Sequence, residues 1–544
     1  MKLLDIDFVI TVDRTLMTDH HGKEFIGFMT TAPPVFFPEK VWMWIAAPKP
    51  RVDEYGRPRV APYGLRKVEA ALLDKGFKAA VIDPDYLEPY LERVKAVMIG
   101  HHDYFAFCPP SCEWWMLTGR EPVNRRYLLR LMRLIARVKK TRNPDLKVIV
   151  AGPSAWQWLY VPDYVEEFLV DCIVEGESGE KAIPWLAQRI LDGEEIPRYL
   201  YVGPVDSPSV EEIPVIKGLS VNGLIEVSRG CPRGCKFCSV TLRPFRHIPL
   251  DKIEAELRLH AEHGVHDGIL HAEDVLLYGA VGVYVNPDAV LKLHALTKKY
   301  YRTFGWSHAA LATVVQAQRR YKLISRLADL IFDEHMDFLG FQTGIETGSP
   351  RLVERDMRGK AAPYSPREWP DIVEEAFSIL HEHNMIPAAT LIIGLPGETE
   401  EDVYKTIELV ERLKPYRSMI IPLFFVPMGA FRRKDWFLSI QLREEHAELL
   451  RICLLHSLRW AKEIIGKYMP GVRYAPVRWA IKLFLAWAEY GARRATARTI
   501  LEFVEQAKER MMRQKAREPL VKRIRERISG ALGRGAVAVP ARTA

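Results

Sequence analysis

The sequence predicts an α/β protein built on parallel sheets and followed by a helical C-terminal region. Short apolar runs alternate with amphipathic helical patterns from residue 62, and a second alternation follows a proline-rich stretch. Strands that read as continuous apolar runs are buried on both faces, which is typical of parallel sheets covered by helices. Beyond residue 430 the pattern is nearly all helical.

The first alternation predicts a doubly wound sheet in residues 61–200. Helices are expected at residues 65–75, which Gly76 ends, and at residues 126–140. Four apolar runs are the expected strands: residues 79–83, 96–100, 148–153 and 171–176. Ligands of such sheets bind at the carboxyl ends of the strands, so that edge is the expected binding site.

Composition divides the rest of the chain. Residues 1–60 carry scattered prolines and predict an irregular extension packed on a domain surface. Residues 201–216 hold Pro204, Pro208 and Pro214 among acidic residues and predict a linker. The expected later segments are an α/β domain at 217–430, a helical domain at 431–515 with helices 442–468, 477–490 and 495–515, and a basic, partly disordered tail at 516–544.

Size and composition indicate a globular protein of two to four domains, because 544 residues exceed one compact core. Hydrophobic residues make up 48% and charged residues 27%, which excludes a disordered chain. No apolar run is long enough to span a membrane, and the first 14 residues lack the basic start of a secretory signal. We therefore expect a cytoplasmic protein. Low asparagine with high charge is typical of thermophiles.

The net charge of +8 belongs to the tail. From Lys508 onward eleven Lys and Arg face three Glu, and eleven minus three equals the whole excess. Such a tail suggests an acidic partner, either a lipid surface or a nucleic acid, or else a solvated tail without a specific partner.

Cys231, Cys235 and Cys238 form a Cys-x₃-Cys-x₂-Cys pattern directly after a predicted strand at 224–227. Three thiolates on one short loop can ligate three irons of a [4Fe–4S] cubane and leave the fourth iron open. A structural zinc site needs four ligands, and no fourth Cys or His lies at the usual spacing. The pattern therefore favours a cluster. Cys108 and Cys112 form a second pair, which cannot complete a cluster alone.

Residues 228–239 around these cysteines resemble the signature of the radical S-adenosylmethionine (SAM) superfamily. Residues 271–274, 344–349 and 392–399 resemble, in the expected order, its later SAM-binding motifs. The resemblance implies a partial (β/α)6 TIM-type barrel over residues 217–430. It also implies SAM contacts from six residues: Phe237, Glu273, Asp274, Glu346, Ile393 and Gly394.

Each implied contact has a chemical reason. A carboxylate such as Glu346 accepts hydrogen bonds from ribose hydroxyls, and Glu273 with Asp274 suits the methionine amine. Gly394 lets the backbone approach a flat adenine closely. Phe237 packs over the adenine in this interpretation, and core packing is its alternative.

Residues 61–200 resemble the Rossmann-like cobalamin-binding domain that precedes the barrel in one branch of the superfamily. Residues 62–65, 150–153 and 174–180 carry this resemblance, although Ala151 replaces a usual glycine. The resemblance implies cobalamin contacts from His101, Gly152, Pro153, Glu175, Gly176 and Glu177. His101 follows a strand and could lie under the corrin ring; a polar loop without that role is the favoured alternative.

Residues 477–488 are rich in Trp and Phe with interleaved basic residues. A helix packed on the barrel explains them best, and an interfacial helix for a lipid-like substrate is the alternative.

The resemblance implies an enzyme that cleaves SAM reductively and abstracts hydrogen from an unactivated carbon. An archaeal membrane lipid that undergoes ring or carbon–carbon bond formation is the leading expected substrate. The alternatives are a cobalamin-dependent C-methyltransferase on a metabolite or protein, and a non-catalytic iron–sulfur or corrinoid carrier.

The expected partners are a reducing electron donor of the ferredoxin or flavodoxin type and a membrane surface at the basic C-terminus. Nucleic acid is not expected, because tRNA methylthiotransferases end in a small β-barrel whereas this C-terminus is helical. The protein would then be cytoplasmic, with a peripheral membrane contact.

Overall fold

The computed structural model describes residues 2–22, 24–34, 38–432, 442–468, 475–516 and 537–538. Its chain forms two compact units. The first contains residues 1–225, 251–264 and 506–544, and the second contains residues 226–250 and 265–505. Each unit is described by itself below.

The first unit is built on a seven-stranded sheet in the order β17-β7-β6-β5-β4-β1-β3. Every neighbouring pair in it is parallel. The strands are β1 (Phe8–Thr11), β3 (Ala79–Val81), β4 (Ala96–Gly100), β5 (Lys147–Ala151), β6 (Cys172–Gly176), β7 (Tyr199–Val202) and β17 (Val537–Ala538). The predicted parallel sheet and its four predicted strands are confirmed, because their bounds differ from the prediction by at most two residues.

Strand β1 corrects the interpretation of residues 1–60 as an irregular extension. It lies inside the sheet, between β3 and β4, and Phe8, Val9 and Ile10 are at most 1% exposed. A four-residue strand is too short to stand out among the prolines and aromatics around it. The tail differs in a smaller way: residues 537–538 pair with β7, and the remaining residues from 517 onward lie outside the described residues.

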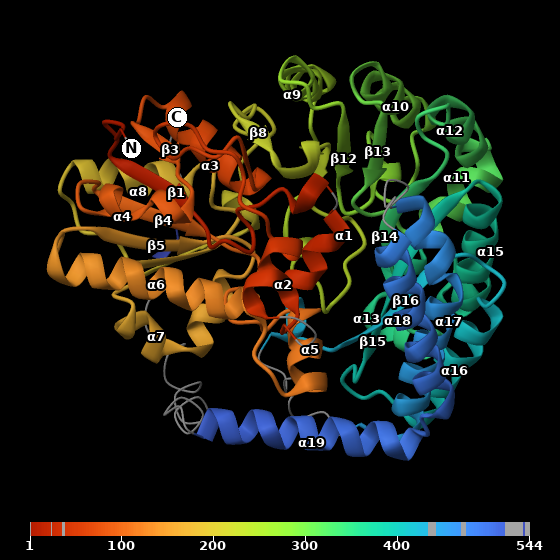
Figure 1. Ribbon diagram of the computed structural model, residues 1–544. Helices are drawn as coiled ribbons and strands as arrows, with labels where there is room; N and C mark the ends of the chain where they lie inside the picture. The colour runs from red at the N-terminus through yellow and green to blue at the C-terminus, as the bar shows by residue number, and fades with distance from the viewer. Residues whose placement is uncertain are drawn as a thin grey trace. The chain divides into compact units, whose positions relative to one another are not determined.

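Helices cover both faces of this sheet (Figure 1). Helices α3 (Tyr63–Asp74) and α8 (Ala182–Leu191) pack together on one face, and α6 (Val123–Thr141) lies on the other. The smaller helices are α1 (Glu24–Gly27), α2 (Glu39–Ala46), α4 (Glu88–Leu91), α5 (Ser111–Thr118) and α7 (Pro162–Glu167). Because β1 has β3 on one side and β4 on the other, the strand order reverses there, and the carboxyl ends of β1 and β4 flank the reversal.

The stretch expected to be a linker is anchored to the first unit by buried charges. Glu256 on α9 (Leu250–Glu262) accepts hydrogen bonds from Tyr63 (2.9 Å), Lys67 (2.8 Å) and the N–H of Ile216 (3.1 Å). Lys67 also donates to the carbonyl of Pro214. Strands β2 (Val60–Ala61) and β8 (Leu219–Ser220) pair nearby.

The second unit contains strands that follow one another in chain order. One sheet has the order β13-β12-β9 and another has the order β14-β15-β16, and a parallel bridge between His308 and Gln342 joins them. The strands are β9 (Leu224–Glu226), which spans the unit boundary, β12 (Asp267–His271), β13 (Thr303–Trp306), β14 (Leu339–Glu346), β15 (Met385–Ile393) and β16 (Met419–Phe424). This order is consistent with the predicted partial barrel.

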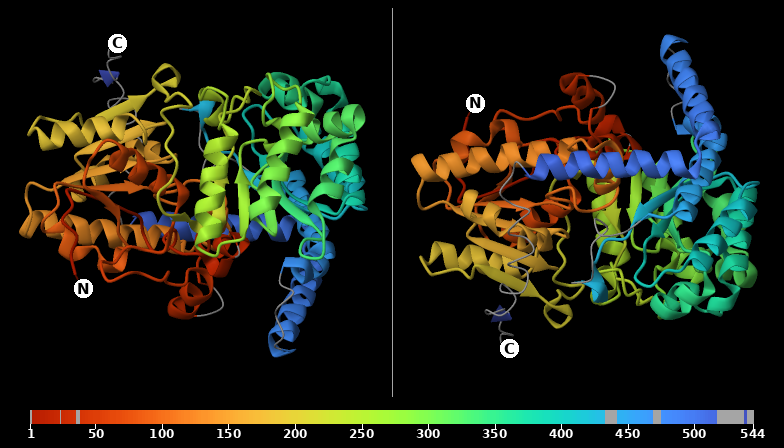
Figure 2. Two further views of the ribbon diagram at one scale, coloured as in Figure 1. Left: turned by 90° about the horizontal axis from the view of Figure 1, so that it is seen from above. Right: turned by 90° about the horizontal axis from the view of Figure 1, so that it is seen from below.

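The helices of this unit lie outside its strands (Figures 1 and 2). They are α10 (Pro287–Tyr300), α11 (Leu311–Tyr321), α12 (Leu323–Ile331), α13 (Pro350–Asp356), α14 (Arg358–Ala361), α15 (Trp369–Glu382) and α16 (Glu400–Arg412). A short hairpin of β10 (Ser228–Arg229) and β11 (Arg246–His247) flanks the cysteine loop.

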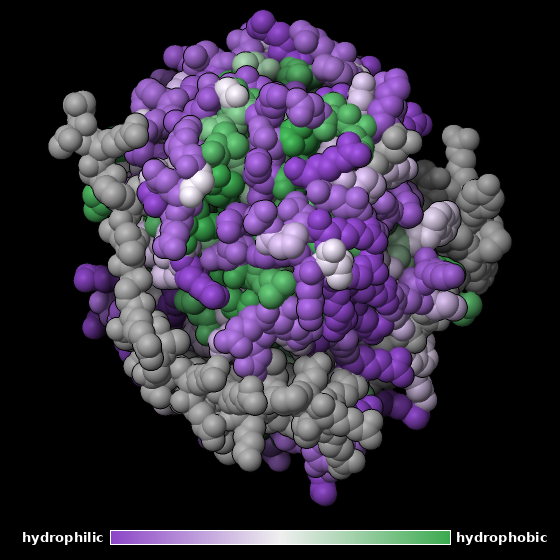
Figure 3. Space-filling model, turned by 90° about the vertical axis from the view of Figure 1, so that its left-hand side faces the viewer, coloured by the Kyte–Doolittle hydropathy of each residue, from purple (hydrophilic) through white to green (hydrophobic). Residues whose placement is uncertain are grey.

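Three long helices confirm the helical C-terminal region: α17 (Glu444–Tyr468), α18 (Ala475–Arg494) and α19 (Ala497–Ala516). Helix α17 packs on β16 and α16. Leu483, Trp487 and Tyr490 on α18 are more than half exposed, so this stretch is not simply core. Within the described residues, none of the helices combines the length and apolarity needed to cross a membrane. The face in Figure 3 is mainly hydrophilic with smaller hydrophobic patches, as on most protein surfaces.

Candidate functional site

The cysteine loop runs irregularly between β10 and residue 240. Cys235 is buried, and Cys231 and Cys238 are half-buried. The Cys238 N–H donates to the Cys235 carbonyl over 3.1 Å, so the last two cysteines share one turn. Burial, with smaller contributions from neighbouring thiols, raises the pKa of Cys231 to about 11 and that of Cys238 to about 12. Without bound metal these residues are therefore neutral thiols at pH 7.

Arg233, inside the loop, joins it to two helices. Its Nη1 donates to the carbonyls of Gly359 (2.9 Å), Lys360 (3.1 Å) and Ala362 (3.1 Å), at and just after α14. Its Nη2 donates to Thr313 on α11. A Cβ on Gly359 would lie 1.9 Å from the Arg233 carbonyl oxygen, so only glycine allows this approach. The loop is thus held by its own arginine.

Glu346 and Lys360 form a buried ion pair next to the loop, with 2.9 Å between Nζ and Oε1. Burial opposes the charge on Lys360, but Glu346 and Cys235 outweigh it and raise the lysine pKa. Glu346 has φ +64°, at a bulge where β14 pairs with β15. Its carboxylate folds over Gly344, where a Cβ would lie 1.8 Å from Oε1. A non-glycine residue with positive φ is uncommon and is often found at functional sites.

The two acidic residues after β12 have different surroundings. Asp274 is buried, and its Oδ2 accepts hydrogen bonds from Thr313 (2.6 Å) and Arg233 (3.4 Å). Glu273 is half-buried and has no hydrogen bond or ion pair among the described residues. Its charge contributes to the raised pKa of Cys238. Glu273 is therefore the better placed of the two to bind a ligand amine, whereas Asp274 mainly fixes Arg233.

Several buried polar atoms of the second unit have no hydrogen-bond partner among the described residues: Ser228 Oγ, Asp274 Oδ1, His308 Nδ1, Gln316 Nε2 and Thr343 Oγ1. An unsatisfied buried polar group costs about 1–3 kcal/mol. These atoms belong to residues of β10, of the segments after β12 and β13, and of α11 and β14. A polar ligand inside this set of strands would satisfy such atoms.

One face of the last sheet is accessible and mostly apolar. Along β15, Ala388, Thr390 and Ile392 are half-buried, while Ala389, Leu391 and Ile393 are buried. Thr390 on the accessible face donates to Glu346 over 3.3 Å, so this face adjoins the ion pair. The side chain of Ile393, which was expected to contact SAM, lies on the opposite face and is 0% exposed. Ile392 is the isoleucine on the accessible face.

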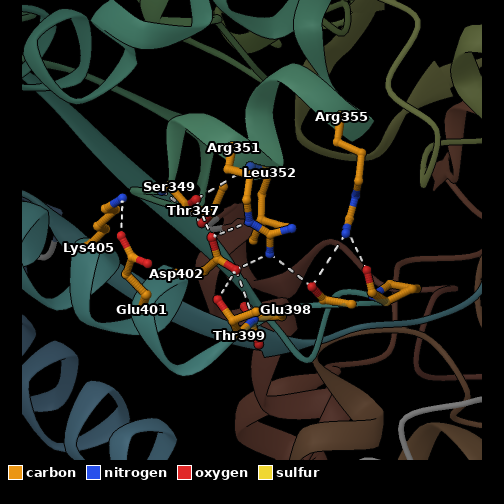
Figure 4. Close-up of polar contacts among 12 residues, drawn as sticks. Thr347, Ser349, Arg351, Leu352, Arg355, Glu398, Thr399, Glu401, Asp402 and Lys405 are labelled. Carbon is orange, nitrogen blue, oxygen red and sulfur yellow. Dashed lines mark hydrogen bonds and ion pairs between the residues drawn. The ribbon is translucent and has the colours of Figure 1, made fainter.

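The glycine turn, residues 394–399 after β15, is bound to α13 by arginine side chains (Figure 4). Arg351 donates to the Gly397 carbonyl (2.9 Å) and pairs with Asp402, which also accepts from Ser349 (2.5 Å). Arg355 reaches the carbonyl of Pro396. The two stretches 344–349 and 394–399 are therefore linked through Asp402 and Arg351.

The family model of the radical SAM superfamily matches residues 225–410. These residues contain the cysteine loop, the ion pair and the glycine turn. Residues 225–410 form a radical SAM domain.

Curated relatives of the radical SAM domain include enzymes of tRNA modification. A tRNA-2-methylthio-N(6)-dimethylallyladenosine synthase of Magnetococcus marinus is 27% identical, over 44% of this chain and 52% of that protein. An uncharacterized protein of Methanopyrus kandleri is 29% identical, over 46% and 45% of the two chains. This chain thus spans about half the length of these relatives.

Among solved structures, the radical SAM methyltransferase TsrM of Kitasatospora setae, with tryptophan and a SAM analogue bound, has a TM-score of 0.45 at 16% identity. The alignment covers 78% of this chain and 75% of that one.

The radical SAM domain fits its family's cofactors, a [4Fe–4S] cluster and SAM. A cubane takes one thiolate on each of three irons, and three thiols on one anchored loop match that need. Within the described residues no three His, Cys, Asp or Glu side chains are placed to hold a single metal ion. A bound SAM would offer hydrogen-bond partners to the unsatisfied buried polar atoms.

The residues expected to bind cobalamin lie at the carboxyl edge of the first unit's sheet. His101 cannot ligate a metal as it stands, because both ring nitrogens are engaged: Nε2 with Asp13 (2.8 Å) and Nδ1 with the N–H of Asp103 (2.8 Å). Burial raises the pKa of Asp13, but the bond and charge of His101 with two bonds from Thr15 outweigh it, so the net shift is downward. His101 thus belongs to a buried polar network.

The loop after β4 is organised by Asp103, which accepts from the N–H groups of Phe107 (2.9 Å) and Cys108 (3.1 Å) and from Gln157 (2.8 Å). Burial nevertheless raises the Asp103 pKa. Its neighbour His102 has an exposed side chain whose pKa is lowered to about 4, chiefly by desolvation. With this lowered pKa the His102 ring is a neutral imidazole at pH 7.

The other expected residues are at the same edge. Gly152 has φ +94°, and a Cβ there would meet the His101 backbone at 2.9 Å. Pro153 follows it, while Glu175 accepts a hydrogen bond from Tyr199 (2.8 Å), Gly176 abuts Val202, and Glu177 is buried. The edge is thus built by β4, β5 and β6 together with Asp13 after β1.

The sequence predicted that the three cysteines, Phe237, Glu273 and Glu346 belong to one domain. It did not identify four residues near them. Phe237 is half-buried within the cysteine loop. The missed residues are Arg233, His308, Lys360 and Thr390. Only Arg233 and Thr390 carried a signal, since Arg233 lies between the cysteines and Thr390 alternates with apolar residues along a strand.

Proposed function

We propose that this chain is a radical SAM enzyme that abstracts hydrogen from an unactivated carbon of an apolar substrate. The observation that carries the proposal is the accessible, mostly apolar face of β15, which adjoins the Glu346–Lys360 pair. A bound [4Fe–4S] cluster and SAM would supply the one-electron reductive cleavage chemistry that this hydrogen abstraction needs. The electron comes from a reducing donor of the ferredoxin or flavodoxin type.

The chain's own residues would bind and orient these groups. Cys231, Cys235 and Cys238 hold the cluster, while Glu346 receives the ribose hydroxyls and Glu273 the methionine amine. Gly394 and Phe237 border the adenine, and Ile392 rather than Ile393 offers its side chain.

Anaerobic reconstitution tests this proposal. The wild-type protein is expected to take up about four irons per chain and to form 5′-deoxyadenosine when reduced with SAM. Replacing Cys235 by alanine abolishes both, whereas Cys172→Ala, at a buried thiol in β6, leaves iron uptake unchanged. A reconstituted protein that never forms 5′-deoxyadenosine would contradict the enzymatic role and favour a carrier.

For the substrate, an archaeal membrane lipid is our proposal, with ring or carbon–carbon bond formation as the outcome. The exposed Leu483, Trp487 and Tyr490 of α18 support an apolar substrate and a peripheral membrane contact. Comparison of lipid profiles from cells with and without the gene decides this point. An unchanged profile excludes it.

A cobalamin-dependent C-methyltransferase is the second candidate, favoured by the reversal of strand order at β1 and β4. The carboxyl edge there carries the Asp13–His101 pair and the accessible ring of His102. Binding of hydroxocobalamin, measured by its absorbance after gel filtration, tests this candidate. Labelled methyl transfer from SAM would then separate it from ring formation.

A further inference from the structure

The glycine turn after β15 is closed by the carboxylate of Glu398. Its Oε2 accepts the backbone N–H of Gly394 over 2.9 Å, and its own N–H donates to the Leu395 carbonyl over 2.9 Å. Gly394 has φ +81°, a conformation that other residues rarely adopt. The carboxylate therefore holds the strand end that borders the proposed adenine site.

The same oxygen of Glu398 contacts a residue outside the matched domain. His446 Nε2 lies 3.0 Å from Oε2, and the two side chains are 2% and 7% exposed. His446 belongs to α17, which begins beyond residue 410, where the family model ends. The turn is thus tied to the C-terminal helix.

The hydrogen bonds of His446 fix its tautomer. Its Nδ1 accepts the backbone N–H of Arg443 over 3.1 Å, so the proton is on Nε2 and is donated to Glu398. Arg443 itself pairs with Glu445 in the first turn of α17. A neutral imidazole is sufficient for this arrangement, and both of its nitrogens are used.

Helix α17 is held along β16 by hydrogen bonds. Ser457 exchanges hydrogen bonds with the backbone of Ile420 (3.1 and 3.0 Å), and His456 pairs with Ser418 over 2.7 Å. Ser418 precedes β16, at the end of the strand opposite the glycine turn. His456 and His446 are therefore two buried histidines of one helix with contacts at opposite ends of the sheet.

We propose that His446 is a positioning residue for SAM: through Glu398 it holds the Gly394 turn in the shape that receives the adenine. The proposal rests on the radical SAM function proposed above and adds a residue from the C-terminal helix to it. Removing the histidine leaves the buried Glu398 carboxylate without one of its donors, so the turn relaxes and SAM binds more weakly.

The test measures SAM affinity on anaerobically reconstituted full-length protein by equilibrium dialysis. His446→Ala is expected to weaken binding by about tenfold, which corresponds to the loss of one hydrogen bond to a charged group. His446→Gln can place a side-chain N–H₂ where Nε2 was and is expected to restore most of the affinity. His446→Asn is too short to reach Glu398 and behaves like the alanine variant.

His456→Ala is the matched control, because it removes a buried histidine of the same helix that bonds at the far end of β16. It is expected to lower the melting temperature but to leave SAM affinity unchanged. Equal losses of affinity in His446→Ala and His456→Ala would show a merely structural effect and overturn the proposal.

Amide hydrogen exchange of residues 391–399 provides a readout that needs neither cluster nor SAM. Exchange of the Gly394 amide is expected to accelerate in His446→Ala and in His446→Asn but not in His446→Gln. Unchanged exchange in all three overturns the proposal even if a variant lacks activity. If wild-type protein fails to bind SAM while the exchange pattern follows the prediction, the turn contact stands and the proposed function fails.

Discussion

At the scale of single residues, glycines determine how closely the cysteine loop can approach α14. Gly359→Ala places a Cβ 1.9 Å from the Arg233 carbonyl oxygen, so the backbone of one partner must move. We expect the variant to lose most of its iron after reconstitution, measured by iron and sulfide analysis.

Gly466→Ala is the matched control, because this glycine on α17 has no atom within 4 Å of a built Cβ. It is expected to keep full iron content and to gain slight stability from better helix propensity. Normal iron content in Gly359→Ala would show that the close approach to Arg233 is dispensable.

Asp402 gives a pH-dependent prediction. Burial raises its pKa, but hydrogen bonds from Arg351, Ser349 and Thr399 outweigh this and hold the pKa below its usual range. A lowered folded pKa means that its stabilisation is present above the unfolded pKa of about 3.9 and is lost as pH falls below it. We expect the melting temperature of the second unit to fall between pH 5 and 3 through this group.

The Asp402→Asn variant should lower stability at pH 7 by about 1–3 kcal/mol, as expected for lost hydrogen bonds to a charged group, and should flatten the acid response. Scanning calorimetry at several pH values measures both effects. Glu401→Gln, which alters only the exposed pair with Lys405 shown in Figure 4, should change neither. An Asp402→Asn variant with the full acid response would assign that response to other carboxylates.

At the scale of elements, β1 is the strand on which the first unit depends. Ile10 is 1% exposed and lies between β3 and β4. Ile10→Ala should destabilise this unit by about 2–5 kcal/mol, the usual effect of emptying a core position. Limited proteolysis and thermal unfolding measure it, with Lys2→Ala as a control whose side chain is 68% exposed. A variant as stable as wild type would place β1 outside the cooperative core.

Element prediction succeeded where a local pattern was long and failed where it was short. Helix α6 and strands β4 to β6 have apolar periods that the sequence shows directly. Strand β1 has four residues, and its burial comes from β3 and β4, which follow about 70 and 90 residues later in the chain. Such a strand is recognised only when its partners are known.

At the scale of the whole molecule, the boundary of the matched domain differs from the boundary of the compact unit. Helix α9 lies within residues 225–410, yet residues 251–264 belong to the first unit. Its buried Glu256 takes its donors from Tyr63 and Lys67. A chain cut to residues 217–430 would expose this carboxylate and the helix face around it. We expect it to be insoluble, in contrast to the full-length protein, as judged by size-exclusion chromatography.

Lys67→Met in the full chain tests the same contact. Removing one partner of a buried ion pair costs about 3–5 kcal/mol, because the other charge stays buried. The double variant Lys67→Met with Glu256→Gln should recover part of that loss in calorimetry. A single variant with wild-type stability would mean that Tyr63 and the N–H of Ile216 suffice to hold Glu256.

The sequence by itself predicted the cofactors of this protein and the α/β class of its fold. The spacing of three cysteines on one loop is a local property, so no fold was needed to recognise a cluster site. Apolar runs that alternate with helices likewise indicate parallel sheets, because a strand buried on both faces is a continuous run of apolar residues.

Only the tertiary structure decided which residues surround that chemistry. Lys360 pairs with Glu346, Arg233 binds the carbonyls of α14, and His446 reaches Glu398 from a helix outside the matched domain. In the structure both ring nitrogens of His101 are hydrogen-bonded, and the side chain of Ile393 lies on the face of β15 opposite the accessible one. These contacts join residues that are up to 129 positions apart, and hydrogen-bond partners at such separations leave no periodic or local pattern in the chain.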